Sequence, residues 1–161
     1  MSGTLSLLAV LAPLLVAGCC FCPPLRSAAG RLAPFSPLPA FMLALFGPEW
    51  QVGLPWVLLG TQWGLDATGR VFLALTTGLW LAAGIYGTHH FVSNAERPGF
   101  QPAWLLSMAG NLGLTVALDM LSFLLFFTLM SVAAYPLIIH DRTPQSLYAG
   151  RIYLLLVVLG E

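Results

Sequence analysis

The sequence contains no lysine, and its six basic residues are balanced by six acidic ones. Only 7% of its 161 residues are charged, whereas a soluble domain usually carries about 25%. No basic patch indicates a nucleic-acid-binding surface. Because 58% of the residues are hydrophobic and the mean hydropathy is +0.88, we expect an all-α integral membrane protein.

Cysteine is also scarce, and the three cysteines sit together as Cys19, Cys20 and Cys22. A zinc or iron–sulfur site needs about four ligands, usually from two separated clusters. The histidines that could complete one, His89, His90 and His140, lie far along the chain. We therefore expect no metal, no other cofactor and no catalytic residue. The cysteines are interpreted as small apolar residues at a membrane edge, with palmitoylation as the alternative.

Leu15 to Cys19 also has the pattern of a bacterial lipoprotein cleavage box that follows an apolar run. A signal peptide normally begins with a positively charged region, but no lysine or arginine precedes this box. We therefore expect the first helix to be retained. The alternative is a stand-alone, lipid-anchored protein with Cys19 as its mature amino terminus.

Apolar runs separated by polar turns predict one membrane domain over residues 1–161 with a bundle of five to six transmembrane helices. The predicted spans cover residues 5–21, 33–46, 71–91, 103–118, 119–139 and 146–161. Gly110 and Gly113 leave room for a close helix neighbour. Residues 47–64 combine helix-breaking glycines and prolines with Trp50, Trp56 and Trp63. Because tryptophan is common at headgroup level, we predict an extended or hairpin-like segment on the membrane surface.

The arginines indicate the orientation of these spans. If the first loop is cytoplasmic, only Arg70 lies outside, together with the acids Glu49, Asp66 and Asp119. The other arginines then all lie inside: Arg26, Arg31, Arg97, Arg142 and Arg151. This arrangement satisfies the positive-inside rule and places the amino terminus outside.

Two stretches have the pattern of a known family. The first is DMLSFLLFFTLM (119–130), followed by AAYPLIIHD (133–141) and AGRIYLLL (149–156); the second is GLDATGRVFLALTTGLWLAAGIYG (64–87). They resemble helices five and six, and helix three, of the antiporter-like membrane subunits. These subunits occur in respiratory complex I, multi-subunit sodium/proton antiporters and membrane-bound hydrogenases. The resemblance covers nearly the whole chain but only about the first six of the family's fourteen helices.

The resemblance implies an amino-terminal segment or split subunit of a proton-translocating membrane subunit in a bacterial or archaeal inner membrane. It implies lipid and other membrane subunits as partners, including a chain that supplies the missing lysine-bearing helices. In the family a glutamate nine residues after the aspartate belongs to the proton path, and Thr128 stands at that position. The alternative is therefore a degenerate structural subunit that moves no protons.

The candidate residues for an ion path are Asp119, Thr128, Tyr135 and His140, with Asp66 and Arg70 as an outer polar pair. Thr128 and Tyr135 share one helical face with Ser131, because the three are spaced three and four apart. We expect Pro136 to kink this helix.

Each of these residues also has an ordinary structural interpretation. Asp119 can be a solvated helix cap instead of part of an ion route. Thr128 can hydrogen-bond within its own helix, as threonines in the membrane often do. His140 can cap a helix end, or it can be held by Asp141 and act as a proton relay.

Overall fold

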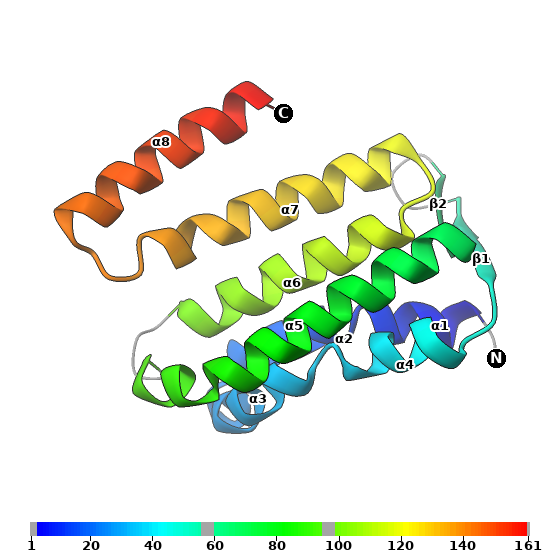
Figure 1. Ribbon diagram of the computed structural model, residues 1–161, viewed down its shortest axis with the longest axis horizontal. Helices are drawn as coiled ribbons and strands as arrows, with labels where there is room; N and C mark the ends of the chain where they lie inside the picture. Colours follow the sequence, from blue (N-terminus) through cyan, green and yellow to red (C-terminus); the bar gives the residue numbers. More distant parts are fainter. Residues whose placement is uncertain (1–2, 56–59, 95–98, 161) are drawn as a thin grey trace.

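The computed structural model describes residues 3–55, 60–94 and 99–160, and these residues are mostly helical. The α-helices are α1 Gly3–Val10, α2 Ala12–Cys20, α3 Arg26–Leu32, α4 Leu38–Phe46, α5 Ala67–Asn94, α6 Phe100–Val116, α7 Met120–Ile138 and α8 Pro144–Gly160. A hairpin of β1 Trp50–Leu54 and β2 Thr61–Leu65 joins α4 to α5. Figure 1 shows the helices running along the long axis, with α5, α6, α7 and α8 alternating in direction.

The first predicted span, 5–21, is divided in two at Leu11, which separates α1 from α2. Pro13 lacks an amide hydrogen and therefore leaves the helical hydrogen-bond ladder incomplete at this point. The ladder nevertheless continues across the break. The Leu11 amide donates to the Leu7 carbonyl at 3.0 Å, and the Leu15 amide donates to the Leu11 carbonyl at 3.1 Å.

The second predicted span, 33–46, begins too late. Helical structure already starts at Arg26 and continues through α3, the short 3-10 helix Ala33–Phe35 and α4. Pro34 and Pro39 lie in the first turns of the last two of these elements, where a missing amide costs no intrahelical bond. The prolines therefore divide the helical segment into short pieces without ending it.

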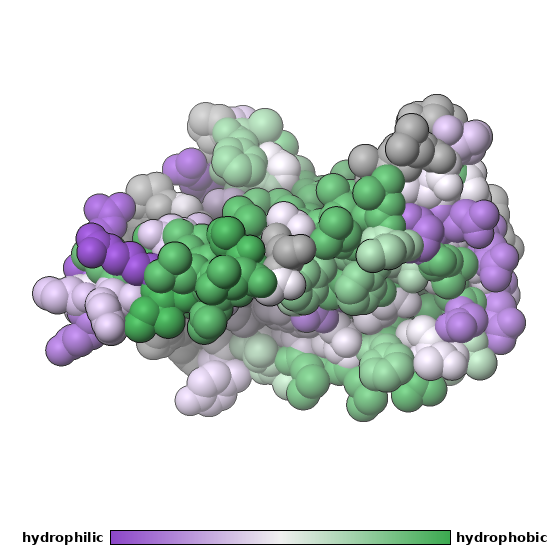
Figure 2. All heavy atoms as spheres, turned by 90° about the horizontal axis from the view of Figure 1, so that it is seen from above, coloured by the Kyte–Doolittle hydropathy of each residue, from purple (hydrophilic) through white to green (hydrophobic). Residues whose placement is uncertain are grey.

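Three helical segments of the described part are long and apolar enough to cross a membrane. They are Arg26–Phe46, Ala67–Gly87 and Met120–Ile138. The helices α6 and α8 have 17 residues each, which corresponds to about 25 Å at 1.5 Å per residue. Figure 2 shows apolar side chains over the length of the molecule and hydrophilic ones gathered at its two ends. The fold is therefore mostly helical with membrane-like character.

The prediction of a hairpin within 47–64 is confirmed. The two strands are antiparallel, with Trp50 opposite Leu65 and Val52 opposite Trp63. These side chains share the face that is turned toward the helices, because cross-strand partners lie on the same side of a sheet. Trp50, Trp63 and Leu65 are accordingly buried, whereas Gln51 is exposed. Trp56, the third tryptophan of the prediction, lies outside the described residues.

Helix α6 lies at the centre of the fold and contacts α2, α5 and α7. Its buried side chains include Leu105, Met108, Leu112 and Val116. The close neighbour predicted from Gly110 and Gly113 is α7: a Cβ atom added to Gly110 would lie 2.6 Å from the backbone nitrogen of Met130. Helix α8, in contrast, packs mainly against α7. Three helices therefore surround α6, and α8 is attached at the edge (Figure 1).

Candidate ion path along helix α7

Asp119 is the N-cap of α7, with an extended backbone conformation. Its carboxylate accepts hydrogen bonds from the Ser122 amide at 2.8 Å and from the Ser122 hydroxyl at 2.6 Å. It also accepts one from the Gln62 amide of β2 at 2.8 Å. The carboxylate thus satisfies a free amide at the start of the helix and at the same time holds the hairpin.

Side chains that the sequence did not indicate also hold the hairpin at the start of α7. Trp63 Nε1 donates to the Ser122 hydroxyl at 2.7 Å, and the Trp63 and Phe126 ring centroids lie 5.2 Å apart. The Leu118 amide also donates to the Gln62 carbonyl at 3.0 Å. Asp119 before an apolar run, with Ser122 three residues later, is the local signal of this capped start.

Burial raises the pKa of the Asp119 carboxyl, but hydrogen bonds oppose this effect. The Ser122 hydroxyl and the amides of Ser122, Gln62 and Leu121 all stabilise the charged form. Together these hydrogen bonds outweigh burial and lower the pKa of Asp119 below its ordinary value. At neutral pH the residue is therefore a fixed carboxylate.

Asp66 and Arg70 lie one turn apart at the start of α5. Asp66 Oδ1 accepts a hydrogen bond from the Gly69 amide at 2.6 Å, so this acid also caps its helix. Within the part of the chain that the structure describes, no ion pair joins the two side chains, and Arg70 Nε is buried without a hydrogen-bond partner. The two residues of the predicted outer pair thus lie close together, but the Asp66 carboxylate caps α5 and the Arg70 Nε atom is buried elsewhere.

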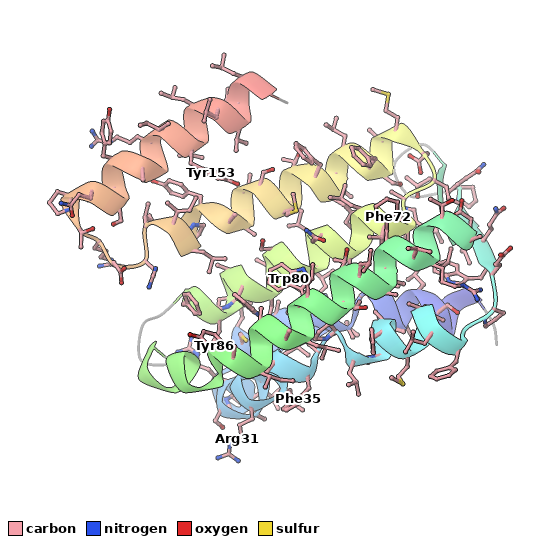
Figure 3. The ribbon with its side chains drawn as sticks, viewed as in Figure 1. Arg31, Phe35, Phe72, Trp80, Tyr86 and Tyr153 are labelled. Atoms are coloured by element: carbon pink, nitrogen blue, oxygen red, sulfur yellow. The ribbon has the colours of Figure 1, made fainter. Side chains whose placement is uncertain are left out.

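The stretch of α7 that carries Ser131 and Tyr135 contacts α8. The Tyr153 hydroxyl of α8 donates to the Ser131 carbonyl at 3.0 Å, and Figure 3 shows Tyr153 between the two helices. A Cβ atom added to Gly150 of α8 would lie 3.1 Å from the Tyr135 ring. Thr128 belongs to the same face by helical periodicity. Sequence reasoning missed Tyr153, although Gly150 and a tyrosine three residues later indicate a packing face.

His140 lies just beyond the other end of α7, between two acceptors. Its Nδ1 atom is 2.9 Å from the Leu137 carbonyl, and its Nε2 atom is 3.1 Å from Asp141 Oδ1. The ring also lies against Phe100, with centroids 5.4 Å apart. The structure thus shows both contacts that were considered for His140, to a carbonyl at the helix end and to Asp141. A ring that carries protons on both nitrogens can donate to both acceptors.

These residues form two end clusters joined by one polar face. Asp119 with Ser122 and His140 with Asp141 are separated by the 19 residues of α7, about 28 Å at 1.5 Å per residue. Between Asp119 and His140 the only titratable side chain in the sequence of α7 is Tyr135. The side chains of His89 and His90, the other predicted relay candidates, lie outside the described residues.

Comparison with protein families and with curated protein sequences finds no match to this chain. The functional interpretation therefore depends on the geometry of α7 and its neighbours.

Proposed function

We propose that this chain is a membrane subunit of a proton-translocating, multi-subunit complex, built like the amino-terminal helices of an antiporter-like subunit. In this proposal the six helical segments are α1–α2, α3–α4, α5, α6, α7 and α8, and each crosses the membrane once. The observation that carries the proposal is the polar face of α7, whose residues Ser131 and Tyr135 contact the outermost helix of the bundle.

The distribution of charge supports insertion with the hairpin end outside and the turn between α7 and α8 in the cytoplasm. Three acidic residues lie next to the hairpin or at the first residues of the helices beside it: Glu49, Asp66 and Asp119. Arg31 lies at the opposite end of the molecule (Figure 3), and Arg142 lies in the turn between α7 and α8 at that same end. A cytoplasmic arginine end and an external hairpin end agree with the positive-inside rule.

The exposed face of α8 supports the presence of a partner. Leu155, Leu156, Val158 and Leu159 are all exposed, although α8 lies beside the polar face of α7. In a bilayer, side chains of this kind contact lipid or another helix. We propose that a chain carrying further helices packs there and completes a path that begins between α7 and α8.

Replacing Thr128 with glutamate tests the transport role. A carboxyl on the polar face adds a titratable group at mid-helix, so we expect proton translocation by the intact complex in vesicles to increase. The matched control is Phe123→Glu, at an exposed position of α7 five residues before Thr128 and therefore outside the polar face. If both variants leave translocation unchanged or abolish it equally, α7 is scaffold and carries no protons.

A second candidate, a structural subunit that moves no protons, is favoured by the state of Asp119. Its carboxylate accepts hydrogen bonds from three groups on α7 and β2, as expected for a residue that holds these two elements together. Assembly distinguishes the two candidates. If Asp119→Asn lowers the amount of assembled complex while translocation per complex is unchanged, the residue holds structure only.

A further inference from the structure

The three cysteines lie away from the α7 path, and the structure separates them by accessibility. Cys20 is buried, with only 3% of its surface exposed, and packs with Ala17, Ala29 and Leu105. Cys19 is half-buried and Cys22 is exposed. By exposed surface, Cys22 is therefore the most accessible thiol and Cys19 the next, while Cys20 is shielded by the core.

The last turn of α2 brings the two accessible cysteines together. The Cys22 amide donates to the Cys19 carbonyl at 3.2 Å, which closes a tight turn over four residues. In a turn of this kind the first and fourth Cα atoms lie within about 7 Å, and disulfides join Cα atoms about 4.4–6.8 Å apart. The neighbouring Cys19 and Cys20 have Cα atoms only about 3.8 Å apart, which is too close for ordinary disulfide geometry.

A side chain of the next helix also bonds to this turn. Arg26 Nε, at the start of α3, donates to the Cys20 carbonyl at 3.3 Å. This bond ties the end of α2 to the start of the next helix, so the spacing of Cys19 and Cys22 does not depend on the thiols themselves. The pair is therefore positioned before any oxidation takes place.

We propose that Cys19 and Cys22 are a reversible redox-active dithiol that closes to a disulfide across the last turn of α2. The oxidant is a low-molecular-weight disulfide of the glutathione class. The Cys22 thiolate attacks it, forms a mixed disulfide and releases one thiol. The Cys19 thiolate then attacks the Cys22 sulfur and releases the second thiol. Two protein thiols are oxidised, one disulfide is reduced, and the two protons pass to the leaving thiolates.

The test uses the full-length chain in detergent, incubated with oxidised glutathione, quenched with acid and examined by intact mass and maleimide labelling. In Cys20→Ser only the proposed pair remains, so we expect loss of two hydrogens, no thiol left to label and full reversal by dithiothreitol. The controls Cys19→Ser and Cys22→Ser are expected to retain one bound glutathione on the remaining accessible cysteine, because neither keeps a second accessible thiol to displace it.

Two outcomes would overturn the proposal. In the first, Cys20→Ser keeps two free thiols or carries two glutathiones without closing a disulfide. In the second, Cys19→Ser closes a disulfide as fast as the wild type, which would assign the bond to Cys20 and Cys22. If Cys20→Ser loses its helical circular dichroism, peptide mapping of the oxidised wild type replaces it, and a single labelled thiol at Cys20 is then the expected result.

Discussion

Helix α7 has two interfaces of opposite character. Toward α6, Phe126 packs against Gly113 and Gly110 lies against the α7 backbone, a close contact crossed by one hydrogen bond from Asn111 Nδ2 to Met130 Sδ at 3.2 Å. Toward α8, the contact includes the Tyr153 hydroxyl on the Ser131 carbonyl and Gly150, which lies against the side chains of Ile139 and Tyr135. The face toward α6 therefore holds α7 in place, and the opposite face carries the polar residues Ser131 and Tyr135.

In the proposed function, this difference separates stability from transport within a single helix. A close-packed apolar contact tolerates little movement, because even a small change in volume produces strain or a cavity. A contact made by side chains and one hydrogen bond can open at lower cost than one in which backbone meets backbone. In the proposed function, α7 is therefore reached by a partner helix or water from the α8 side, while the α6 side keeps the helix in place.

Gly110→Leu is expected to have the largest effect, because it breaks the tight interface. An added Cβ atom would lie 2.6 Å from the Met130 amide nitrogen and 2.8 Å from the Phe126 carbonyl oxygen, so backbone must move. Overpacking of this kind typically costs about 3 kcal/mol. Thermal unfolding in detergent, followed by circular dichroism, measures the loss.

The matched control is Gly18→Ala in α2, since an added Cβ atom there meets nothing within 4 Å. Alanine is the better helix former, so we expect this variant to be as stable as the wild type or more stable by about 0.5–1 kcal/mol. Equal losses in the two variants would show that the α6–α7 contact is no tighter than an open helix surface.

Tyr153→Phe tests the looser interface and is expected to have a smaller effect. It removes the hydroxyl that donates to the Ser131 carbonyl and leaves the ring in place. The expected loss is about 1 kcal/mol, the usual net contribution of one hydrogen bond. Hydrogen exchange should accelerate in α8 and leave α6 unchanged. Tyr148→Phe, at an exposed position of the same helix, serves as the control and should change neither.

Local patterns predicted those parts of the fold that depend on nearby residues. Helix-breaking glycines and prolines together with tryptophans indicated the hairpin, and an aspartate before an apolar run offered a capped helix start as one of two interpretations. The start of the second helical segment was wrong by several residues because Pro34 and Pro39 were interpreted as its beginning. Both occupy first-turn positions of short helical pieces that follow one another closely in the chain.

The contacts that define the site join residues far apart in the chain, and no local pattern encodes them. Trp63 and Ser122 are 59 residues apart, and Ser131 and Tyr153 are 22 apart. Periodicity grouped Thr128, Ser131 and Tyr135 on one face, and the Ser131 carbonyl and the Tyr135 ring both contact α8. It could not tell which neighbouring helix that face meets, because this depends on how α6 and α8 pack around α7.

The smallest expected effect concerns the hairpin end of α7 and depends on pH. Because the folded protein lowers the pKa of Asp119, its stabilising contribution is complete above the unfolded value, about 3.9, and is lost as the pH falls through the folded value. The amide side chain introduced by Asp119→Asn can still cap the helix but does not titrate. The stability difference between wild type and variant should therefore be constant near neutral pH and shrink in acid. The change should be small, since solvent partly screens this carboxylate. A difference that stays constant down to about pH 2 would mean that the hairpin is held by Trp63 and the backbone bonds alone, and that charge on Asp119 contributes nothing to the fastening of α7.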